Sequence, residues 1–308
     1  MESLAQIGER GLIARLRPIL PTGGDVRIGA GDDCAVVAPP PGEELVLKSD
    51  PIQEGHHFVP GEDPRRIGRK ALGRVLSDFA AMGATPRWAL LDFTAPADTP
   101  VAVADGIYEG LRERAAAYGV SIVGGDTSRG DGISLHVFAA GSVPAGTALR
   151  RSAARPGDAL YLTGRIGRSF ESGHHLDFRP RLPEGDWLRR RPVHACIDLS
   201  DGLASELWHI AEESGMRLEV DDEALPLSDT CRALPDPVAH AYADGEDFEL
   251  LFSAPETDTA LPAAFRAAFP DTPLTRIGSV SAAAPGGGLV LRAGEPLPKG
   301  GFDHFKRI

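Results

Sequence analysis

The chain has 308 residues, of which 42% are hydrophobic and 25% charged, as in ordinary globular proteins, and this length suggests two domains. Its formal net charge of −12 argues against a nucleic-acid-binding surface, which would need a basic patch. The charge does not exclude a small anionic substrate, because bound metal ions could supply positive charge locally.

The N-terminal segment and the cysteines indicate where the protein works. Residues 1–20 carry charges throughout and lack the apolar stretch of a signal peptide. Nowhere does an apolar run reach the roughly 18 residues of a membrane span. Cys34, Cys196 and Cys231 form neither a CxxC pair nor a disulfide pattern. We therefore expect a cytoplasmic protein.

The first half of the chain alternates strand-like and helix-like patterns. Residues 44–50 form a short predicted strand that ends at Asp50. Apolar residues recur at helical spacing over residues 64–84, which predicts a helix that starts near Pro64 and stops at Gly83. The further predicted elements are a strand at 87–93, a helix at 103–119, and strands at 120–126 and 133–143. An α/β or α+β domain therefore ends near residue 148.

The second half begins with a predicted linker at residues 150–158. The elements expected after it are a strand at 159–164, a strand, turn and helix within 193–215, strands at 217–222, 248–254 and 275–280, and a helix within 257–270. Residues 165–191 are polar and show little periodicity. We interpret this stretch as a long loop or lid.

Asp78 stands out because it lies on or beside the apolar face of the first predicted helix. Val75, Phe79 and Met82 share that face, and a carboxylate among them needs a partner. A salt bridge to Arg74, one helical turn earlier, is a purely structural explanation. At this point that explanation and a functional role are both open.

The sequence CIDLSDGL places two more aspartates at a strand-to-helix junction. Asp198 ends the predicted strand, and Asp201 opens the predicted helix. Ser200 or Asp201 could simply cap the helix, but a cap leaves Asp198 without a role. Helix N-termini that follow strands also bind phosphates through their free backbone N–H groups.

Two further acidic motifs are weaker signals. In GGDTSRG, Gly125 precedes Asp126 at the end of a predicted strand, which suits either a tight turn or close approach of the backbone to a phosphate. In DGEDFELLF, Glu246 and Asp247 precede an apolar strand, where solvated turn residues are the alternative to a site.

Together, these motifs place seven aspartates at element ends or on an apolar face: Asp32, Asp33, Asp50, Asp78, Asp126, Asp198 and Asp201. If several converge, each close pair repels by roughly 4 kcal/mol at about 4 Å and an effective dielectric of about 20. Bound cations would relieve that repulsion, and oxygen ligands suit Mg²⁺, which joins carboxylates to substrate phosphates. The pattern indicates phosphoryl transfer, although neither a P-loop nor the protein-kinase motifs are present.

The order of the motifs resembles one known family. GERGLIARL, GAGDDCAVV, SDPIQEGHHF, LSDFAAMGATP, GGDTSRG, RSAARPGD, IDLSDGL, GEDFELLF and KGGFDHF follow one another as in the thiamine-monophosphate kinases. Those enzymes belong to the superfamily of aminoimidazole ribonucleotide synthetase, selenophosphate synthetase and the hydrogenase maturation protein HypE. SDPIQEGHHF and GGFDHF favour the thiamine enzymes over these relatives.

The resemblance implies the two-domain α/β (α+β) fold of aminoimidazole ribonucleotide synthetase. Residues 1–148 would form an α/β domain that binds ATP and metal and forms a homodimer. Residues 149–308 would form an α+β domain that completes the ATP and substrate site. The implied reaction passes the γ-phosphate of ATP to thiamine monophosphate with the help of several Mg²⁺ ions. Neither nucleic acid nor a membrane is expected as a partner.

The resemblance also implies roles for individual residues. The magnesium ligands would be Asp33, Ser49, Asp50, Asp78, Asp126, Asp198 and Asp201. The ATP contacts would be Tyr108, Gly125, Arg151 and Ser200, and the thiamine monophosphate contacts would be His57, Glu246 and Phe302. No catalytic base is expected, because the attacking phosphate oxygen is already anionic. For His57, a surface histidine beside His56 is the alternative.

The sequence departs from the family pattern at several points. Lys48 stands where the family usually has a small hydroxyl residue, and Pro51 removes a backbone donor next to Asp50. Val75 replaces a common asparagine, and the region 165–191 is shorter than usual. Two other functions therefore stay open: phosphoryl transfer by the same fold to another small acceptor, and a nucleotide-binding paralogue without catalysis.

Overall fold

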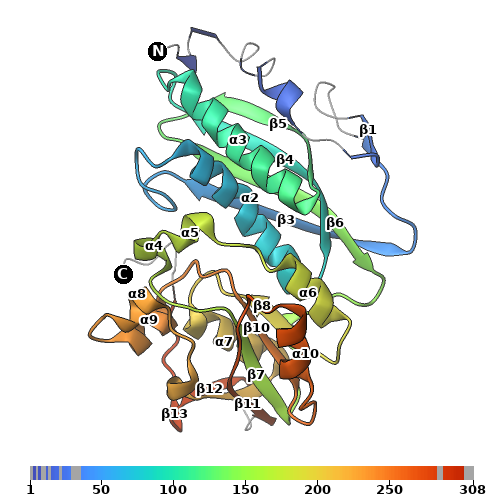
Figure 1. Ribbon diagram of the computed structural model, residues 1–308, viewed down its shortest axis with the longest axis vertical. Coiled ribbons are helices and arrows are strands. Elements are labelled where there is room, and N and C mark those ends of the chain that lie inside the picture. Colours follow the sequence, from blue (N-terminus) through green and yellow to red (C-terminus); the bar gives the residue numbers. More distant parts are fainter. Residues whose placement is uncertain are drawn as a thin grey trace. The chain divides into compact units, whose positions relative to one another are not determined.

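The computed structural model describes residues 3–4, 6–7, 12, 15–20, 23–28, 36–282 and 287–301 (Figure 1). The chain divides into two compact units: Met1–Phe79 with Ala84–Gly146, and Ala80–Gly83 with Thr147–Ile308. Four residues from the sequence analysis lie outside the described residues: Asp32, Asp33, Cys34 and Phe302. Within the described ranges, no helix is long and apolar enough to cross a membrane.

The first unit is built on a four-stranded sheet in the order β3-β6-β4-β5. Its strands are β3 (Glu43–Gln53), β4 (Thr85–Ala95), β5 (Ser121–Arg129) and β6 (Ser134–Pro144). β6 runs antiparallel to β3 and to β4, whereas β4 and β5 are parallel. The smaller elements are η1 (Arg17–Ile19) and the antiparallel pair β1 (Val26–Ile28) and β2 (Val36–Val37).

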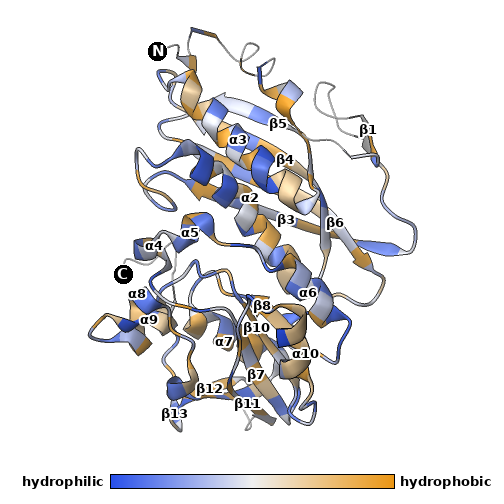
Figure 2. Ribbon diagram, viewed as in Figure 1, coloured by the Kyte–Doolittle hydropathy of each residue, from blue (hydrophilic) through white to orange (hydrophobic). Residues whose placement is uncertain are grey.

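Two long helices, α2 (Pro64–Ala81) and α3 (Val101–Tyr118), pack on one face of this sheet (Figure 1). Both predicted helices are confirmed. Proline suits the first position of α2 because the N–H that it lacks has no partner inside the helix. α3 ends at Gly119, whose φ of 68° forms a left-handed cap. Figure 2 shows hydrophilic and hydrophobic residues on both helices, as expected for helices with one side against a sheet.

The opposite face of the sheet exposes large apolar side chains. Leu45 and Leu47 of β3, Leu90 of β4 and Phe138 of β6 are at least 40% exposed. Side chains alternate between the two faces of a strand, and the register pairs Phe138 with both Ser49 and Leu90. These four residues therefore share one face, which we call the open sheet face.

The second unit is built on a seven-stranded sheet in the order β13-β12-β9-β11-β7-β10-β8. Its strands are β7 (Asp158–Thr163), β8 (Ala195–Asp198), β9 (Met216–Val220), β10 (Leu250–Pro255), β11 (Leu274–Ala282), β12 (Leu289–Arg292) and β13 (Glu295–Pro296). Neighbouring strands are antiparallel, except for the parallel pair β9 and β12. Such a sheet with helices around it is α+β, and the predicted mixed fold class is confirmed.

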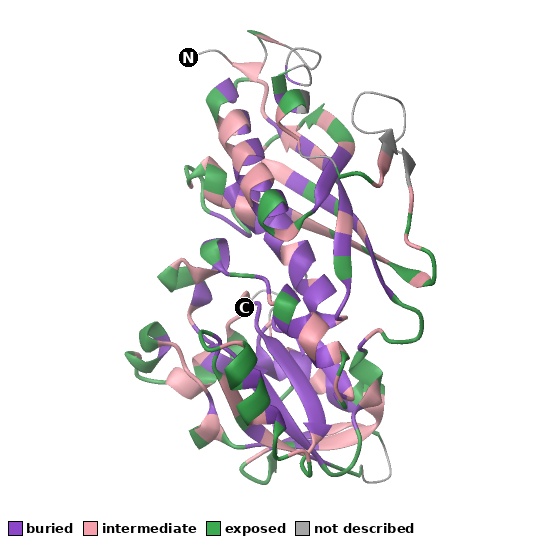
Figure 3. Ribbon diagram, turned by 45° about the vertical axis from the view of Figure 1, so that its right-hand side comes forward, coloured by how far each residue is buried: buried purple, intermediate pink, exposed green. Residues whose placement is uncertain are grey.

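The core of the second unit lies between this sheet and helix α7 (Leu203–Ser214). Leu207 and Ile210 of α7 are fully buried in one cluster with Leu160 and Ile197 of the sheet. Figure 3 shows the central strands of this unit as buried along most of their length, in agreement with the continuous burial of β7. This core holds the C-terminal end of β8, and with it Asp198, in place.

The interpretation of residues 165–191 as a long loop or lid is wrong, because three short helices lie within it. The remaining elements of the second unit are η2 (Arg151–Ala153), α4 (Ser169–Ser172), α5 (His174–Asp177), α6 (Leu182–Arg189), η3 (Asp222–Ala224), α8 (Asp229–Arg232), α9 (Pro237–Ala243) and α10 (Leu261–Ala268). Helices of one or two turns are too short to show a helical period. Burial of Leu176, Phe178 and Leu188 stabilises them instead.

Two predicted strand ends are also wrong. β3 does not end at Asp50 but continues through Pro51 to Gln53. The missing N–H of Pro51 is tolerated because β3 is an edge strand. β5 continues past Asp126 to Arg129, so Asp126 lies inside a strand and not at its end.

Close contact between α2 and α3 depends on glycine, and this gives a stability prediction. A Cβ at Gly68 would lie 1.9 Å from the carbonyl oxygen of Ile107. Alanine favours a helix over glycine by about 1 kcal/mol, but this clash outweighs that gain. We expect Gly68→Ala to lower the free energy of unfolding by about 2 kcal/mol, measured by urea titration.

The exposed Ala116→Ser on α3 is the control for this substitution and should change the free energy of unfolding by less than about 0.5 kcal/mol. A Gly68→Ala protein that is as stable as the wild type would show that the two helices can separate at no cost.

Candidate functional site

In the first unit, Asp50 and Asp78 share a cationic partner. The Lys48 Nζ atom lies 2.8 Å from Asp78 Oδ1 and 3.9 Å from Asp50 Oδ2. Arg74 adds a second positive charge, with Nη2 3.5 Å from Asp50 Oδ1. The structure therefore brings two of the predicted magnesium ligands together, with positive charge already between and beside them.

The geometry of β3 and α2 explains this arrangement. Lys48 and Asp50 are two residues apart on β3, so both side chains point to the same face of the sheet. Arg74 and Asp78 are one helical turn apart on α2, which packs on that face. The sequence analysis offered a salt bridge to Arg74 as one of two explanations for Asp78 and did not foresee Lys48. The contact between Lys48 and Asp78 joins a strand to a helix, so no local spacing rule reveals it.

The strand register places Asp126 on the other face of the sheet. Asp126 pairs with Asp92, Asp92 with His136, and His136 with Pro51, the neighbour of Asp50. Side chains at directly paired positions share a face, so Asp126 and Asp50 point in opposite directions. Asp126 is exposed, and its Oδ1 accepts a hydrogen bond from the Thr127 N–H at 2.8 Å. This unit therefore does not gather Asp126 with Asp50 and Asp78.

Ser49 and Gly125 also lie in these strands. Ser49 is exposed and pairs with Phe138, so its side chain lies on the open sheet face. Gly125 has a φ of 152°, and a Cβ there would lie 1.8 Å from the Leu91 carbonyl oxygen. Only glycine fits this close approach of β5 to β4. Gly125 of GGD thus has a structural role in the sheet.

Two other predicted site residues of the first unit are buried. Tyr108 packs edge-on against Phe93, with ring centroids 6.2 Å apart, and burial raises its pKa, with a smaller contribution from the charge of Asp92. The alternative of a surface histidine at position 57 is wrong, because His57 is only 6% exposed. Its Nδ1 accepts a hydrogen bond from the Gln53 N–H at 3.0 Å.

In the second unit, Asp198 and Asp201 stand beside a third carboxylate that the sequence analysis did not single out. Glu206, in the first turn of α7, is buried, and its Oε1 accepts hydrogen bonds from the N–H groups of Ser200 at 3.1 Å and Asp201 at 2.8 Å. The alternative in which Ser200 or Asp201 caps the helix is wrong, since Gly202 is the N-cap residue and has no side chain. Glu206 instead accepts hydrogen bonds from the N–H groups that precede the N-cap. This resembles a capping box in which the acidic residue lies one position later in the helix.

Glu206 lies among other carboxylates in this acidic cluster. Burial, together with the charges of Asp201 and Asp198, raises the pKa of Glu206 to about 7 from its ordinary value of 4.5. Its Oε2 is buried and makes no hydrogen bond of normal length with any described residue. Oxygen donors of this kind suit Mg²⁺. The described residues nevertheless contain no group of three or more His, Cys, Asp or Glu side chains placed to hold a metal ion by themselves.

Glu246 lies in a strained loop that packs against the Asp198–Asp201 turn. The backbone φ of Glu246 is 64° and that of Phe248 is 53°. Residues other than glycine rarely adopt these left-handed values. The Glu246 N–H donates to the Ser200 carbonyl at 2.7 Å, and Ser169 Oγ donates to the Glu246 carbonyl at 2.7 Å. Backbone strain of this kind occurs at binding sites, where neighbouring contacts hold it in place.

The side chain of Glu246 meets an aromatic pair. Its Oε2 lies 3.3 Å from Nδ1 of His175, and the His175 ring stacks on Phe170 at a centroid distance of 4.5 Å. Phe170 is 47% exposed. The predicted substrate contact Glu246 therefore lies near the exposed ring of Phe170, and aromatic rings of this kind pack on heteroaromatic ligands.

Arg151, the remaining predicted ATP contact, is exposed in η2, where its carbonyl oxygen accepts a hydrogen bond from Ser214 Oγ at 2.9 Å. Its side chain is thus available to a ligand from solvent.

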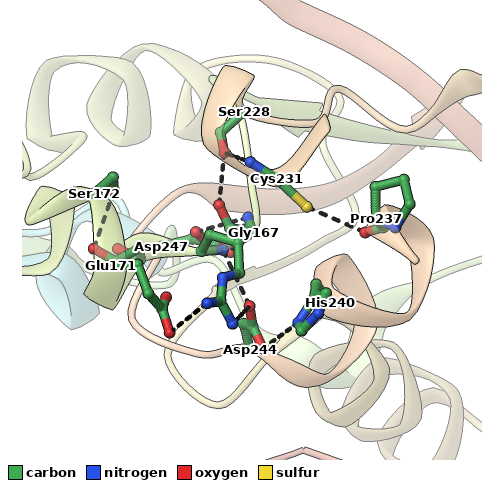
Figure 4. A network of polar contacts seen from close by, with 11 residues as sticks. Gly167, Glu171, Ser172, Ser228, Cys231, Pro237, His240, Asp244 and Asp247 are labelled. Carbon is green, nitrogen blue, oxygen red and sulfur yellow. Dashed lines mark hydrogen bonds and ion pairs between the residues drawn. The ribbon is translucent and has the colours of Figure 1, made fainter. Parts of the chain in front are cut away.

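A network of polar contacts supports the Glu246 loop (Figure 4). The Gly167 N–H donates to both carboxylate oxygens of Asp247, at 3.0 and 3.1 Å. Ser228 Oγ donates to the Gly167 carbonyl at 2.7 Å, and the Arg168 N–H donates to Asp244 at 3.2 Å. The alternative of solvated turn residues is wrong for Asp247, which is 2% exposed. Its carboxylate ties residues 244–248 to the turn before α4.

The buried carboxyl of Asp247 gives a pH-dependent prediction. Burial raises its pKa well above 3.8, and the charges of Glu249, Asp244 and Glu246 add to this effect. The folded chain therefore keeps a proton at pH values where the unfolded chain is ionised, so this group lowers stability as pH rises above 3.8.

We expect Asp247→Asn to remove this decline, whose slope is at most about 1.4 kcal/mol per pH unit. The measurement is denaturant unfolding at several pH values from acid to neutral. Asp229→Asn, with a side chain 91% exposed, is the matched control. Parallel pH profiles for Asp247→Asn and the wild type would contradict the assigned effect.

Comparison with known proteins places the chain in a family. Residues 31–143 match the family model described as AIR synthase related protein, N-terminal domain. The chain is 39% identical over 310 residues to the thiamine-monophosphate kinase of Salmonella typhimurium, covering 91% of this chain and 93% of the relative.

Two solved structures are similar over most of the chain. The thiamine-monophosphate kinase of Stenotrophomonas maltophilia K279a has a TM-score of 0.82 and 33% identity, covering 93% of this chain and 96% of that one. AaThiL complexed with AMPPCP and TMP has a TM-score of 0.77 and 29% identity, covering 99% of both chains. Because the sequence identity extends over nearly the whole chain, this protein belongs to the thiamine-monophosphate kinase family.

Proposed function

We propose that this chain transfers the γ-phosphate of ATP to thiamine monophosphate with the help of Mg²⁺, giving thiamine diphosphate and ADP. The observation that carries the proposal is the 39% identity, over 91% of the chain, to a thiamine-monophosphate kinase. The site geometry supports it, because the Ser200 carbonyl joins the acidic cluster to the loop of Glu246.

In this reaction a phosphate oxygen of thiamine monophosphate forms a bond to the γ-phosphorus of ATP, and the bond from that phosphorus to the β–γ bridging oxygen breaks. The attacking oxygen is anionic, so no side chain has to remove a proton. Bound Mg²⁺ would neutralise phosphate charge and stabilise the transition state. The chain itself has to hold two mutually repelling anions in line.

The proposed roles follow the two units. Mg²⁺ would be held by residues from Asp33, Asp50, Asp78, Asp198 and Asp201, whereas the predicted ligands Ser49 and Asp126 lie on the open sheet face, opposite to Asp50. ATP would contact Tyr108, Gly125, Arg151 and Ser200, and thiamine monophosphate would contact His57, Glu246 and Phe302. We propose that residues 1–148 bind ATP and metal and mediate dimerisation, and that residues 149–308 complete the site. A cytoplasmic location fits Cys196 and Cys231, which are free thiols.

The first test is formation of thiamine diphosphate from ATP and thiamine monophosphate, with and without Mg²⁺. We expect product only with Mg²⁺, and we expect Asp201→Asn to lower kcat by at least about 100-fold without loss of the fold. Arg276→Gln, at an exposed ion pair on β11, is the control and should retain full activity.

Failure of this test would be informative. ATP binding without any product would favour a non-catalytic paralogue. Product with a different small phosphorylated or carboxylated acceptor, but not with thiamine monophosphate, would favour a related phosphotransferase. Near-normal turnover of Asp201→Asn would remove that residue from the proposed ligand set.

We also propose that the chain forms a homodimer through its open sheet face. Leu45, Leu47, Leu90 and Phe138 form an exposed apolar surface on three adjacent strands, and homodimer interfaces are rich in such residues. A second copy fits this surface because apolar groups would meet apolar groups across a two-fold axis.

We expect Leu47→Asp to shift the protein from dimer to monomer, because the carboxylate would be buried without a partner. Light scattering after size-exclusion chromatography measures the mass. Val59→Asp, at another exposed apolar residue outside this face, should leave the dimer intact. A monomeric wild-type protein, or a dimeric Leu47→Asp protein, would contradict the proposal.

A further inference from the structure

The strongest disagreement between this chain and a magnesium site lies at Lys48. Its Nζ atom is 2.8 Å from Asp78 Oδ1 and 3.9 Å from Asp50 Oδ2, the two carboxylates that β3 and α2 would offer to a metal ion. Ammonium groups and metal ions compete for the same carboxylate oxygens. The first unit therefore does not present Asp50 and Asp78 as vacant ligands.

The charges around Asp50 and Asp78 also argue against a divalent ion between these two residues. The two carboxylates carry two negative charges, and Lys48 and Arg74 carry two positive charges within 4 Å of them. The repulsion that would make a divalent ion necessary is thus already removed by the protein. A divalent ion bound by both aspartates would also stand close to the ammonium group, and two cations in contact repel each other.

The side chain of Lys48 is held where this contact is made. Lys48 lies on a strand that is paired with β6 along its whole length, and its side chain is 33% exposed. Asp78 belongs to α2, whose buried residues fix the helix against the sheet. The distance between the backbones of residues 48 and 78 therefore cannot adapt freely, and the length of a lysine spans it.

We propose that Lys48 is a built-in cation that takes the place of one divalent ion between Asp50 and Asp78. This inference rests on the proposed magnesium-dependent function and reduces by one the number of ions that the first unit binds. A small hydroxyl residue at this position lacks both the length and the charge to do so. In that case the two carboxylates would be left for a metal ion.

The test counts bound ions without measuring activity. Mn²⁺ is the probe, because free Mn²⁺ gives a sharp electron paramagnetic resonance signal that bound Mn²⁺ loses. Titrations with saturating AMPPCP compare the wild type with Lys48→Ser, Lys48→Met and Lys48→Arg. We expect Lys48→Ser and Lys48→Met to bind one Mn²⁺ more per chain than the wild type, and Lys48→Arg to bind the wild-type number.

Arg87→Ser is the matched control. It removes a positive charge from the same sheet, where Arg87 pairs with Glu43 at 3.3 Å. Glu43 is seven residues from Asp50 along β3, or about 23 Å. If loss of any nearby cation increased Mn²⁺ binding, Arg87→Ser would gain an ion as well, and we expect that it does not.

A second readout uses the metal-free protein. In EDTA, Lys48→Ser and Lys48→Met should unfold at a lower temperature than the wild type, because the ammonium group no longer separates Asp50 and Asp78. Added Mn²⁺ should then stabilise these two variants more than it stabilises the wild type. Circular dichroism before each titration establishes that the variants are folded.

The possible results distinguish the proposed role of Lys48 from the proposed metal-dependent phosphoryl transfer. Equal numbers of Mn²⁺ ions in the wild type, Lys48→Ser and Lys48→Met would overturn the role of Lys48 while leaving metal-dependent transfer intact. No bound Mn²⁺ in any of these proteins would overturn the proposed metal requirement, and the inference with it.

Discussion

Several carboxylates in both units are partly or fully removed from water, and each depends on a partner that stabilises it. A charge removed from water needs a cation, a hydrogen-bond donor or a proton, and this chain uses all three solutions. Lys48 and Arg74 neutralise Asp50 and Asp78, backbone N–H groups bind Glu206 and Asp247, and burial raises the pKa of both of the latter. Basic side chains thus neutralise Asp50 and Asp78 in the first unit, while Glu206 in the second unit lies among the carboxylates of Asp198 and Asp201.

Under the proposed function, the two units would have unequal roles toward a magnesium nucleotide. An incoming cation would favour the ionised form of Glu206, whose pKa is raised by burial and by the charges of Asp201 and Asp198. The loop of Glu246 is bound to the same turn through the Ser200 carbonyl. A cation that orders the turn would therefore also order the proposed substrate contact. Asp247 holds the other side of that loop, so the strained backbone at Glu246 is fixed from two directions.

The elements that sequence could predict are those with a long repeating pattern. α2 and α3 are confirmed because eighteen residues each give several turns of apolar periodicity, whereas α4 and α5 have four residues each and gave none. Motif order was sufficient for the family. It also singled out Asp50 and Asp78, which share a partner in the structure and whose role as ligands stays a prediction. It could not reveal Lys48 as their partner or the face on which Asp126 lies, because both depend on pairing between distant segments. Glu206 was within reach, since an acid in the first turn of a helix commonly binds preceding N–H groups.

The register of the first sheet has a consequence for synthesis of the chain. Asp50 on β3 pairs with Val137 on β6, so β3 emerges from the ribosome long before β6, the strand beside it in this sheet. Until then β3 is an unpaired strand that carries Leu45 and Leu47, a combination that promotes aggregation. Charged residues inside such a strand oppose wrong pairing, and Lys48 and Asp50 stand beside those leucines. The same two charges that shape the site would then protect the nascent chain while it waits for β6.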